Sequence, residues 1–330
     1  MKKSISKQIK HKVFWVLGSV VVVIAILLFR PLNTQNLISY SQPKTNYETV
    51  VDEITRIQKQ ENSEINPLCS TQLLTHGKRV AKVIVFLHGY TNCPQQISVL
   101  GSKFFDLGYN VYVPRQSHHG LKDRLTPDIQ FLTAEEMVKF TDEILDQAHG
   151  LGTEVILVGL SGGGTMAAWA AQNRADLDKS VIVAPMLSIF DEEWMEVSLI
   201  NVVRSLPNFF RWWDPKLKGD YAGPSYAYPR YATHSLNEIL RLGFGVWEKA
   251  KTSPPLGKSV LVVTNARDTA VNNKVTSELV GLWNKQTPEK IATYEFAKEL
   301  NLTEHDLIDP HQPKQQVNVV YPILIGLIDK

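Results

Sequence analysis

Short apolar runs alternate with longer amphipathic stretches from residue 80 onward. The runs are typical of strands buried on both faces of a sheet, and the stretches between them have the spacing of helices. Strands are predicted at 83–87, 111–113, 155–158, 181–184, 260–264 and 292–296, and helices at 135–148, 165–175 and 275–283. This alternation predicts an α/β fold whose mostly parallel sheet is covered by helices on both faces.

The segment between Pro185 and Ser259 breaks the alternation, because more than seventy residues pass without a clear strand. A segment of this length inside a compact domain is normally functional or has structure of its own. We predict a helical cap inserted at about 188–255. Its many aromatic residues can face a ligand, but for most of them a place in the cap's own core is the simpler interpretation.

The residues before the sheet divide into two further parts. Residues 31–45 are polar and contain two prolines, which is typical of a stalk. In the stretch 47–60, apolar residues recur at helical spacing and predict a packed helix. The predicted organisation is therefore a stalk and helix at 31–66, followed by one domain at 67–330.

The N-terminus combines five lysines within residues 1–12 with an uncharged apolar run from Val13 to Phe29. This pattern predicts a membrane anchor at 13–29, with residues 1–30 forming a cytoplasmic tail and transmembrane segment and the rest extracytoplasmic. A cleaved signal peptide is the alternative. The sequence from Arg30 to Asn33 offers it no cleavage site of small residues.

Composition limits the classes of partner. A content of 44% hydrophobic and 21% charged residues is that of a folded globular protein, and a net charge of +2 without basic clusters in the body gives no reason to expect nucleic acid. No Cys/His cluster has zinc spacing, so neither a metal nor another cofactor is expected. Cys69 and Cys93 can pair in an extracytoplasmic compartment, but two buried free thiols fit the sequence equally well.

The glycine-flanked serine in Gly159-Leu160-Ser161-Gly162-Gly163 follows a predicted strand and precedes a predicted helix. Strand, sharp turn and helix form a nucleophile elbow, in which Gly159 and Gly163 permit the turn and the serine hydroxyl is exposed. The motif predicts that Ser161 is the nucleophile of an acyl transfer. A G-x-S-x-G sequence often occurs by chance, so this prediction depends on whether the surrounding residues fit the motif.

A serine nucleophile needs a base to take its proton and an acid to orient that base. Asp268 lies just beyond the strand 260–264, and His305 follows the next predicted strand. The order Ser161, Asp268, His305 is that of the nucleophile-elbow fold. We predict these three residues as nucleophile, acid and base.

Three residues near His305 compete for these roles. Asp306 and Asp309 are alternative acids, but an adjacent residue cannot easily turn its carboxylate onto its neighbour's ring nitrogen. His311 is the alternative base, and it lies between two prolines at the start of the predicted last helix. Position along the chain therefore favours Asp268 and His305.

Backbone N–H groups are the usual donors to the oxyanion of the tetrahedral intermediate. One is predicted at Gly162, directly after the nucleophile, and the other at Tyr90 in the loop after the strand 83–87. Gly89 permits the turn, and His88 is expected to hold the loop rather than act as a base. Without the elbow, this loop is an ordinary turn.

The residues from His88-Gly89-Tyr90-Thr91 through the elbow to Asp268 and His305 resemble the α/β-hydrolase superfamily. Within it, the chain resembles membrane-anchored bacterial carboxylesterases and lysophospholipase-like lipases. The stretch 114–120 is similar to a loop that such enzymes place at the mouth of the site. The H-G-G-G loop of one lipase group is absent, since Tyr90 follows Gly89, so the resemblance indicates the reaction type better than the substrate.

The resemblance and the motifs together predict a serine hydrolase that cleaves carboxylic esters through an acyl-enzyme. The anchor and the aromatic cap favour small-molecule or lipid-like esters. A peptidase or amidase is an alternative, because Asp191, Glu192 and Glu193 can hold a charged substrate terminus. A thioesterase of the same fold and a non-catalytic, membrane-tethered binding module also fit these features.

Overall fold

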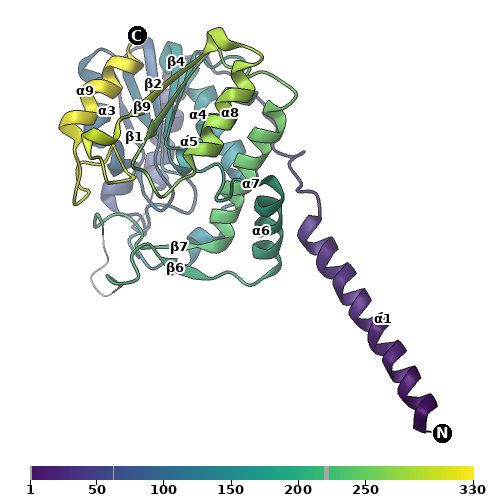
Figure 1. Ribbon diagram of the computed structural model, residues 1–330. Coiled ribbons are helices and arrows are strands. Elements are labelled where there is room, and N and C mark those ends of the chain that lie inside the picture. The colour runs from purple at the N-terminus through teal and green to yellow at the C-terminus, as the bar shows by residue number, and fades with distance from the viewer. Residues whose placement is uncertain (1, 62, 219–222) are drawn as a thin grey trace.

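A seven-stranded sheet forms the centre of the protein (Figure 1). The structure is a computed structural model that describes residues 2–61, 63–218 and 223–330. The strands are β1 (Gln72–Leu74), β2 (Val80–Leu87), β3 (Asn110–Val113), β4 (Gly152–Leu160), β5 (Lys179–Val183), β8 (Ser259–Asn265) and β9 (Ile291–Phe296). Their order is β1-β3-β2-β4-β5-β8-β9, and only β1 runs antiparallel to its neighbour. The predicted fold class is confirmed.

The central strands are apolar throughout because both faces of the sheet are covered. Val83 to Leu87 of β2 are fully buried, and β2 pairs in parallel with β4 so that Leu87 lies opposite Gly159. The predicted strands are all present. β1 was not predicted, since three half-buried residues leave no periodic signal.

Helices cover both sides of the sheet (Figure 1). α3 and α9 lie on one side, and α4 and α5 lie on the other. The helices are α1 (Lys2–Phe29), α2 (Tyr47–Gln60), α3 (Ser98–Asp106), α4 (Ala134–Leu151), α5 (Gly162–Asn173), α6 (Glu193–Ser205), α7 (Thr233–Ala250), α8 (Asn273–Asn284) and α9 (Val317–Ile328). α4 begins with a capping box, in which Thr133 Oγ1 accepts the Glu136 N–H and Glu136 Oε2 accepts the Thr133 N–H.

The chain between β5 and β8 folds as α6, two short strands and α7. β6 (Phe210–Trp212) and β7 (Arg230–Ala232) pair antiparallel, and residues 219–222 lie outside the described part. The prediction of a helical segment did not include this hairpin, because each strand has only three residues. α7 packs against α5 beside the main sheet. The division of residues 188–255 from the rest of the domain as a cap remains a prediction.

The polar segment 31–45 is held against α4. The backbone N–H of Tyr40 donates to Asp142 Oδ2 at 2.6 Å, and the backbone N–H of Gln42 donates to Asp146 Oδ2 at 2.9 Å. α2 follows and buries its apolar face on the domain. These bonds use the carboxylates of two aspartates that are themselves part of a buried ionic cluster.

Arg174 is the centre of that cluster, and its side chain is fully buried. Its guanidinium contacts Asp142 at 2.9 Å, Asp146 at 2.7 Å and Asp176 at 2.7 Å. Burial opposes the charged guanidinium, but the hydrogen bonds to the aspartates outweigh this effect and raise the pKa of Arg174 above its usual value. The same contacts hold the pKa of Asp176 well below its usual value despite partial burial.

Removing this guanidinium is expected to destabilise the fold. Arg174→Leu leaves buried carboxylates without a counter-charge, so the free energy of unfolding should fall by about 3–5 kcal/mol in urea titrations. Lys139→Ala removes the exposed ion pair with Glu143 on the same helix and should cost less than about 1 kcal/mol. Equal, small losses in both variants would show that the cluster adds no stability.

Cys69 and Cys93 form a disulfide, and both residues are buried. The sequence left pairing and free thiols as equal alternatives. The bond joins η1 (Pro67–Cys69) to the residue that precedes η2 (Pro94–Ile97). It therefore connects the segment before β1 to the loop that follows β2.

The predicted membrane anchor at 13–29 is wrong. Among the helices of the described residues, none has the length and apolar character needed to cross a membrane. The uncharged run from Val13 to Phe29 covers 17 residues, or roughly 26 Å of helix against a hydrocarbon core of about 30 Å. The lysine-containing residues before it lengthen α1 but add no apolar span. The predicted topology, with a cytoplasmic N-terminus and an extracytoplasmic domain, has no support in the structure.

Candidate functional site

Ser161 lies in a sharp turn between β4 and α5. Its backbone has φ 56° and ψ −115°, a region that residues with a Cβ atom rarely adopt. A Cβ atom placed on Gly159 would lie 2.0 Å from the Gly163 carbonyl oxygen, and one on Gly163 would lie 2.4 Å from the Leu87 carbonyl oxygen. Both glycines are therefore required for strand and helix to cross this closely.

The predicted site residues all lie at the carboxyl end of the sheet. Tyr90 follows β2, Ser161 follows β4, Asp268 follows β8 and His305 follows β9. Tyr90, Ser161 and His305 line one cavity of about 540 Å³. In parallel sheets this edge is where ligands bind, because the loops that follow the strands converge there.

His305 and Asp268 are hydrogen-bonded to each other. His305 Nδ1 lies 2.7 Å from Asp268 Oδ2, and the other carboxylate oxygen accepts the backbone N–H of Ala270 at 2.8 Å. The Asp268 side chain is fully buried, whereas 26% of the His305 side chain is exposed. A carboxylate accepts, so Nδ1 carries a proton, and in the neutral ring Nε2 presents a lone pair.

Nε2 of His305 is buried and has no hydrogen-bond partner among the described residues. The Ser161 hydroxyl is not bonded to it in this conformation, although both side chains line the same cavity. Ser161 itself is only 8% exposed. The unpartnered Nε2 of His305 and the Ser161 hydroxyl therefore belong to the same cavity.

In the loop after β2, the Gly89 carbonyl is engaged in hydrogen bonds, whereas the Tyr90 N–H of the same peptide bond is not. The Gly89 carbonyl accepts the Asn92 N–H at 3.1 Å and contacts His88 Nδ1 at 3.0 Å. The peptide bonds of the described residues are trans, so the N–H of Tyr90 points away from that carbonyl. It has no acceptor among the described residues.

The N–H groups of Tyr90 and Gly162 lie near each other. A Cβ atom placed on Gly162 would stand 3.3 Å from the Tyr90 nitrogen and 3.1 Å from its Cβ atom. Gly162 is the first residue of α5, where N–H groups have no partner within the helix. No acceptor within the described chain pairs with the Gly162 N–H. The Tyr90 nitrogen therefore lies close to Gly162, the residue that follows the serine.

His88 is fully buried, and burial lowers its pKa well below the usual value, so the ring is neutral. Its Nδ1–H donates to the Gly89 carbonyl, and its Nε2 accepts the Gln116 N–H at 3.3 Å. The ring packs against His119, whose pKa burial lowers to about 4. Neither nitrogen of His88 is free to accept a proton.

The competing pair His311 and Asp309 lies elsewhere. His311 Nδ1 is 3.1 Å from Asp309 Oδ1, and the Tyr226 hydroxyl donates to the same carboxylate at 2.7 Å. Burial and the neighbouring charge of Asp306 raise the pKa of Asp309 to about 6. Neither His311 nor Asp309 lines the cavity that contains Ser161.

The sequence matches the Alpha/beta hydrolase family over residues 84–297, which is more than half of the chain. The chain belongs to this family. The matched residues include Tyr90, Ser161 and Asp268, and His305 lies beyond them. The prediction of a hydrolase is thereby confirmed. No curated protein matches the sequence of the chain.

Solved structures confirm the fold of this α/β-hydrolase. A metagenome-derived lipolytic enzyme is 18% identical, with a TM-score of 0.55 over 80% of this chain and 99% of that chain. The monoacylglycerol lipase of Paleococcus ferrophilus is 17% identical, with a TM-score of 0.58 over 78% and 98%. The monoglyceride lipase of Saccharomyces cerevisiae is 11% identical, with a TM-score of 0.57 over 79% and 91%.

Two residues at the site of this hydrolase were missed by sequence reasoning. Gln96 Nε2 donates to Asp306 Oδ2 at 2.6 Å, and Gln96 Oε1 accepts the Gly89 N–H at 2.8 Å. The two side chains are 210 positions apart, and neither belongs to a motif. Asp306 was considered only as an acid for His305. No sequence signal indicates this contact.

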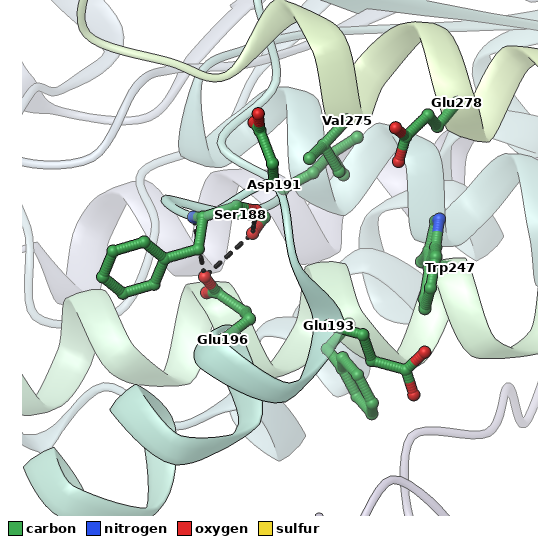
Figure 2. A pocket seen from close by; sticks show the side chains of 10 residues that line it. Ser188, Asp191, Glu193, Glu196, Trp247, Val275 and Glu278 are labelled. Carbon is green, nitrogen blue, oxygen red and sulfur yellow. Dashed lines mark hydrogen bonds between the residues drawn. The ribbon is translucent and has the colours of Figure 1, made fainter.

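A second cavity of the hydrolase, of about 30 Å³, is lined by residues of α6, α7 and α8 and of the loop before α6 (Figure 2). Glu196 Oε2 accepts the Ser188 hydroxyl at 2.8 Å and the N–H groups of Ile189 and Phe190 at 3.1 Å. These bonds organise the turn before α6. None of the predicted catalytic or oxyanion residues lines this cavity, and its volume suits about one or two water molecules. The cavity at Ser161 is therefore the candidate active site.

Proposed function

We propose that this α/β-hydrolase cleaves carboxylic esters through an acyl-enzyme on Ser161. The observation that carries the proposal is the buried Nε2 of His305, which has no partner among the described residues and lies in the same cavity as the strained serine. The bond to Asp268 keeps the proton on Nδ1, so that Nε2 is the basic atom.

The reaction then follows in two halves. His305 Nε2 takes the Ser161 Oγ proton as the oxygen attacks the ester carbonyl, and the N–H groups of Tyr90 and Gly162 bind the oxyanion. The imidazolium gives its proton to the departing alcohol. In the second half His305 deprotonates a water that attacks the acyl carbon, and the proton returns to Ser161 as the acid leaves.

The cavity walls favour an ester of an apolar acid with a polar alcohol. Apolar side chains come from β4 and from the chain between β5 and β8, and polar ones come from the loops after β2 and β9. The first group includes Leu160, Met186, Trp213 and Leu236, and the second includes Asn92, Glu304 and Lys314. The monoacylglycerol and monoglyceride lipases that share this fold are named for esters of this kind.

A peptidase, an amidase and a binding module have less support. Asp191 pairs with Lys274 and Glu193 pairs with Lys251, and neither acidic residue lines the cavity. The acidic cluster therefore gives no support to a site for a charged peptide terminus. A non-catalytic binding module has no need of a strained serine, a buried basic nitrogen and two N–H groups without acceptors. A thioester would meet the same groups as an ester.

Turnover of matched p-nitrophenyl esters, thioesters and anilides tests this function. Esters should react faster than anilides of the same acid. Over short chains, kcat/KM should rise about fourfold per added methylene, because each buried CH₂ is worth about 0.8 kcal/mol. Faster anilide turnover would favour an amidase. No turnover, together with no labelling by a fluorophosphonate probe, would favour a binding module.

A further inference from the structure

The side chain of Gln96 links the loop after β2 to the loop after β9. Gln96 is 2% exposed and is hydrogen-bonded at both ends of its amide. Its Oε1 accepts the Gly89 N–H at 2.8 Å, and its Nε2 donates to Asp306 Oδ2 at 2.6 Å. Gly89 precedes Tyr90, and Asp306 follows His305. The amide therefore spans the space between the two loops.

Both ends of this link are themselves held by further hydrogen bonds. Asp306 Oδ1 accepts the N–H groups of Ile308 at 3.2 Å and Asp309 at 3.1 Å, which fixes the carboxylate plane. The peptide unit that contains the Gly89 N–H is held at its other end, where the His88 carbonyl accepts Gln116 Nε2 at 2.8 Å. The amide of Gln96 therefore joins two rigid groups.

We propose that Gln96 and Asp306 form a brace that positions the Tyr90 N–H relative to His305. The proposal rests on the function proposed above. The Gly89 N–H and the Tyr90 N–H belong to consecutive peptide units, so releasing the first lets the second rotate. A donor misplaced by about 1 Å costs about 100-fold in rate. Gln96 and Asp306 are positioning residues, and their loss should act on kcat more than on KM.

The polarity of the brace provides a sharp test. Gln96→Glu places two carboxylates against each other, which repel at this distance. In Asp306→Asn, the side-chain oxygen stays with the two backbone N–H groups, so the amide NH₂ faces the NH₂ of Gln96. In the double variant, the carboxylate at 96 accepts from both the Gly89 N–H and the amide at 306. Donor and acceptor match again between positions 96 and 306, whereas the side-chain amides of Gln312 and Asn92, which donate to Asp306 Oδ2 at 3.0 and 3.4 Å in wild type, still meet an NH₂ group.

Hydrolysis of p-nitrophenyl butyrate by the full chain measures the effect. Each single variant should lower kcat about 10- to 100-fold with KM within about threefold, and the double variant should have a kcat about fivefold or more above either single variant. Gln312→Glu is the matched control, because Gln312 Nε2 also donates to Asp306 Oδ2, at 3.0 Å, but has no bond to Gly89. Its loss of kcat should be smaller than that of Gln96→Glu.

The outcomes separate this inference from the proposed function. Wild-type protein that neither turns over esters nor reacts with a fluorophosphonate contradicts the proposed function. Active wild type with undiminished single variants overturns the brace alone. A double variant that is no more active than the singles also overturns it, even where a single variant is poorly folded. A Gln312→Glu loss equal to that of Gln96→Glu would assign the effect to charge crowding at Asp306.

Discussion

Replacing Ser161 by alanine is expected to abolish labelling by a fluorophosphonate probe and to lower kcat for ester hydrolysis by about 10⁴-fold or more. The serine oxygen forms the covalent bond in the proposed reaction, and alanine leaves only the oxyanion donors and substrate binding. Alanine keeps the Cβ atom that serine already places at this strained backbone position and loses only the hydroxyl, so the variant should fold. Labelling followed on a gel and single-turnover kinetics give the measurement.

Ser180→Ala is the matched control for this experiment. Ser180 is fully buried, its hydroxyl donates to the Ala167 carbonyl at 2.8 Å, and it does not line the cavity. Labelling should stay as in wild type. If Ser161→Ala reacts with the probe as fast as wild type does, then Ser161 is not the nucleophile, and another residue at the carboxyl end of the sheet must be considered.

Replacing Asp268 by asparagine should lower kcat by about 10⁴-fold while leaving the fold intact. Both carboxylate oxygens accept hydrogen bonds, one from Ala270 N–H and one from His305 Nδ1–H. Asparagine keeps only one acceptor. With its oxygen on Ala270, its NH₂ faces Nδ1 and moves the ring proton to Nε2, where it blocks the base. Esterase assays beside circular dichroism measure both effects.

Asp309→Asn is the comparison that decides between the two histidine–aspartate pairs. The side chain of Asp309 is as buried as that of Asp268, but the Tyr226 and His311 that it contacts do not line the cavity. Its substitution should change kcat within about threefold, since it touches no reacting group. A larger loss from Asp309→Asn than from Asp268→Asn would transfer the acid and base roles to Asp309 and His311.

The strands could be predicted because a parallel sheet covered on both faces leaves continuous apolar runs such as Val83 to Leu87. β1, β6 and β7 could not, because each has only three residues, too few to show a period. The prediction of a membrane anchor was wrong because it rested on the absence of charge. Val13 to Phe29 is uncharged, but absence of charge is a weaker condition than sufficient apolar length.

Some features of the candidate site could also be predicted from the sequence, and others could not. The glycine-flanked Ser161 is visible in the sequence because strand, turn and helix are local, and Asp268 and His305 are visible because each follows a strand of the sheet. That Asp268 rather than Asp309 bonds His305 depends on how the loops after β8 and β9 meet. The sequence suggested it only by position.

The sequence by itself determined the α/β class, the elbow around Ser161 and the order of the residues at the strand ends, since each of these depends on short-range sterics and periodicity. Only the tertiary structure decided that Cys69 bonds Cys93 and that Gln96 joins Gly89 to Asp306. The physical reason is separation. A contact between residues 210 positions apart forms when loops from different strands converge, and the residues leave no pattern along the chain that records it.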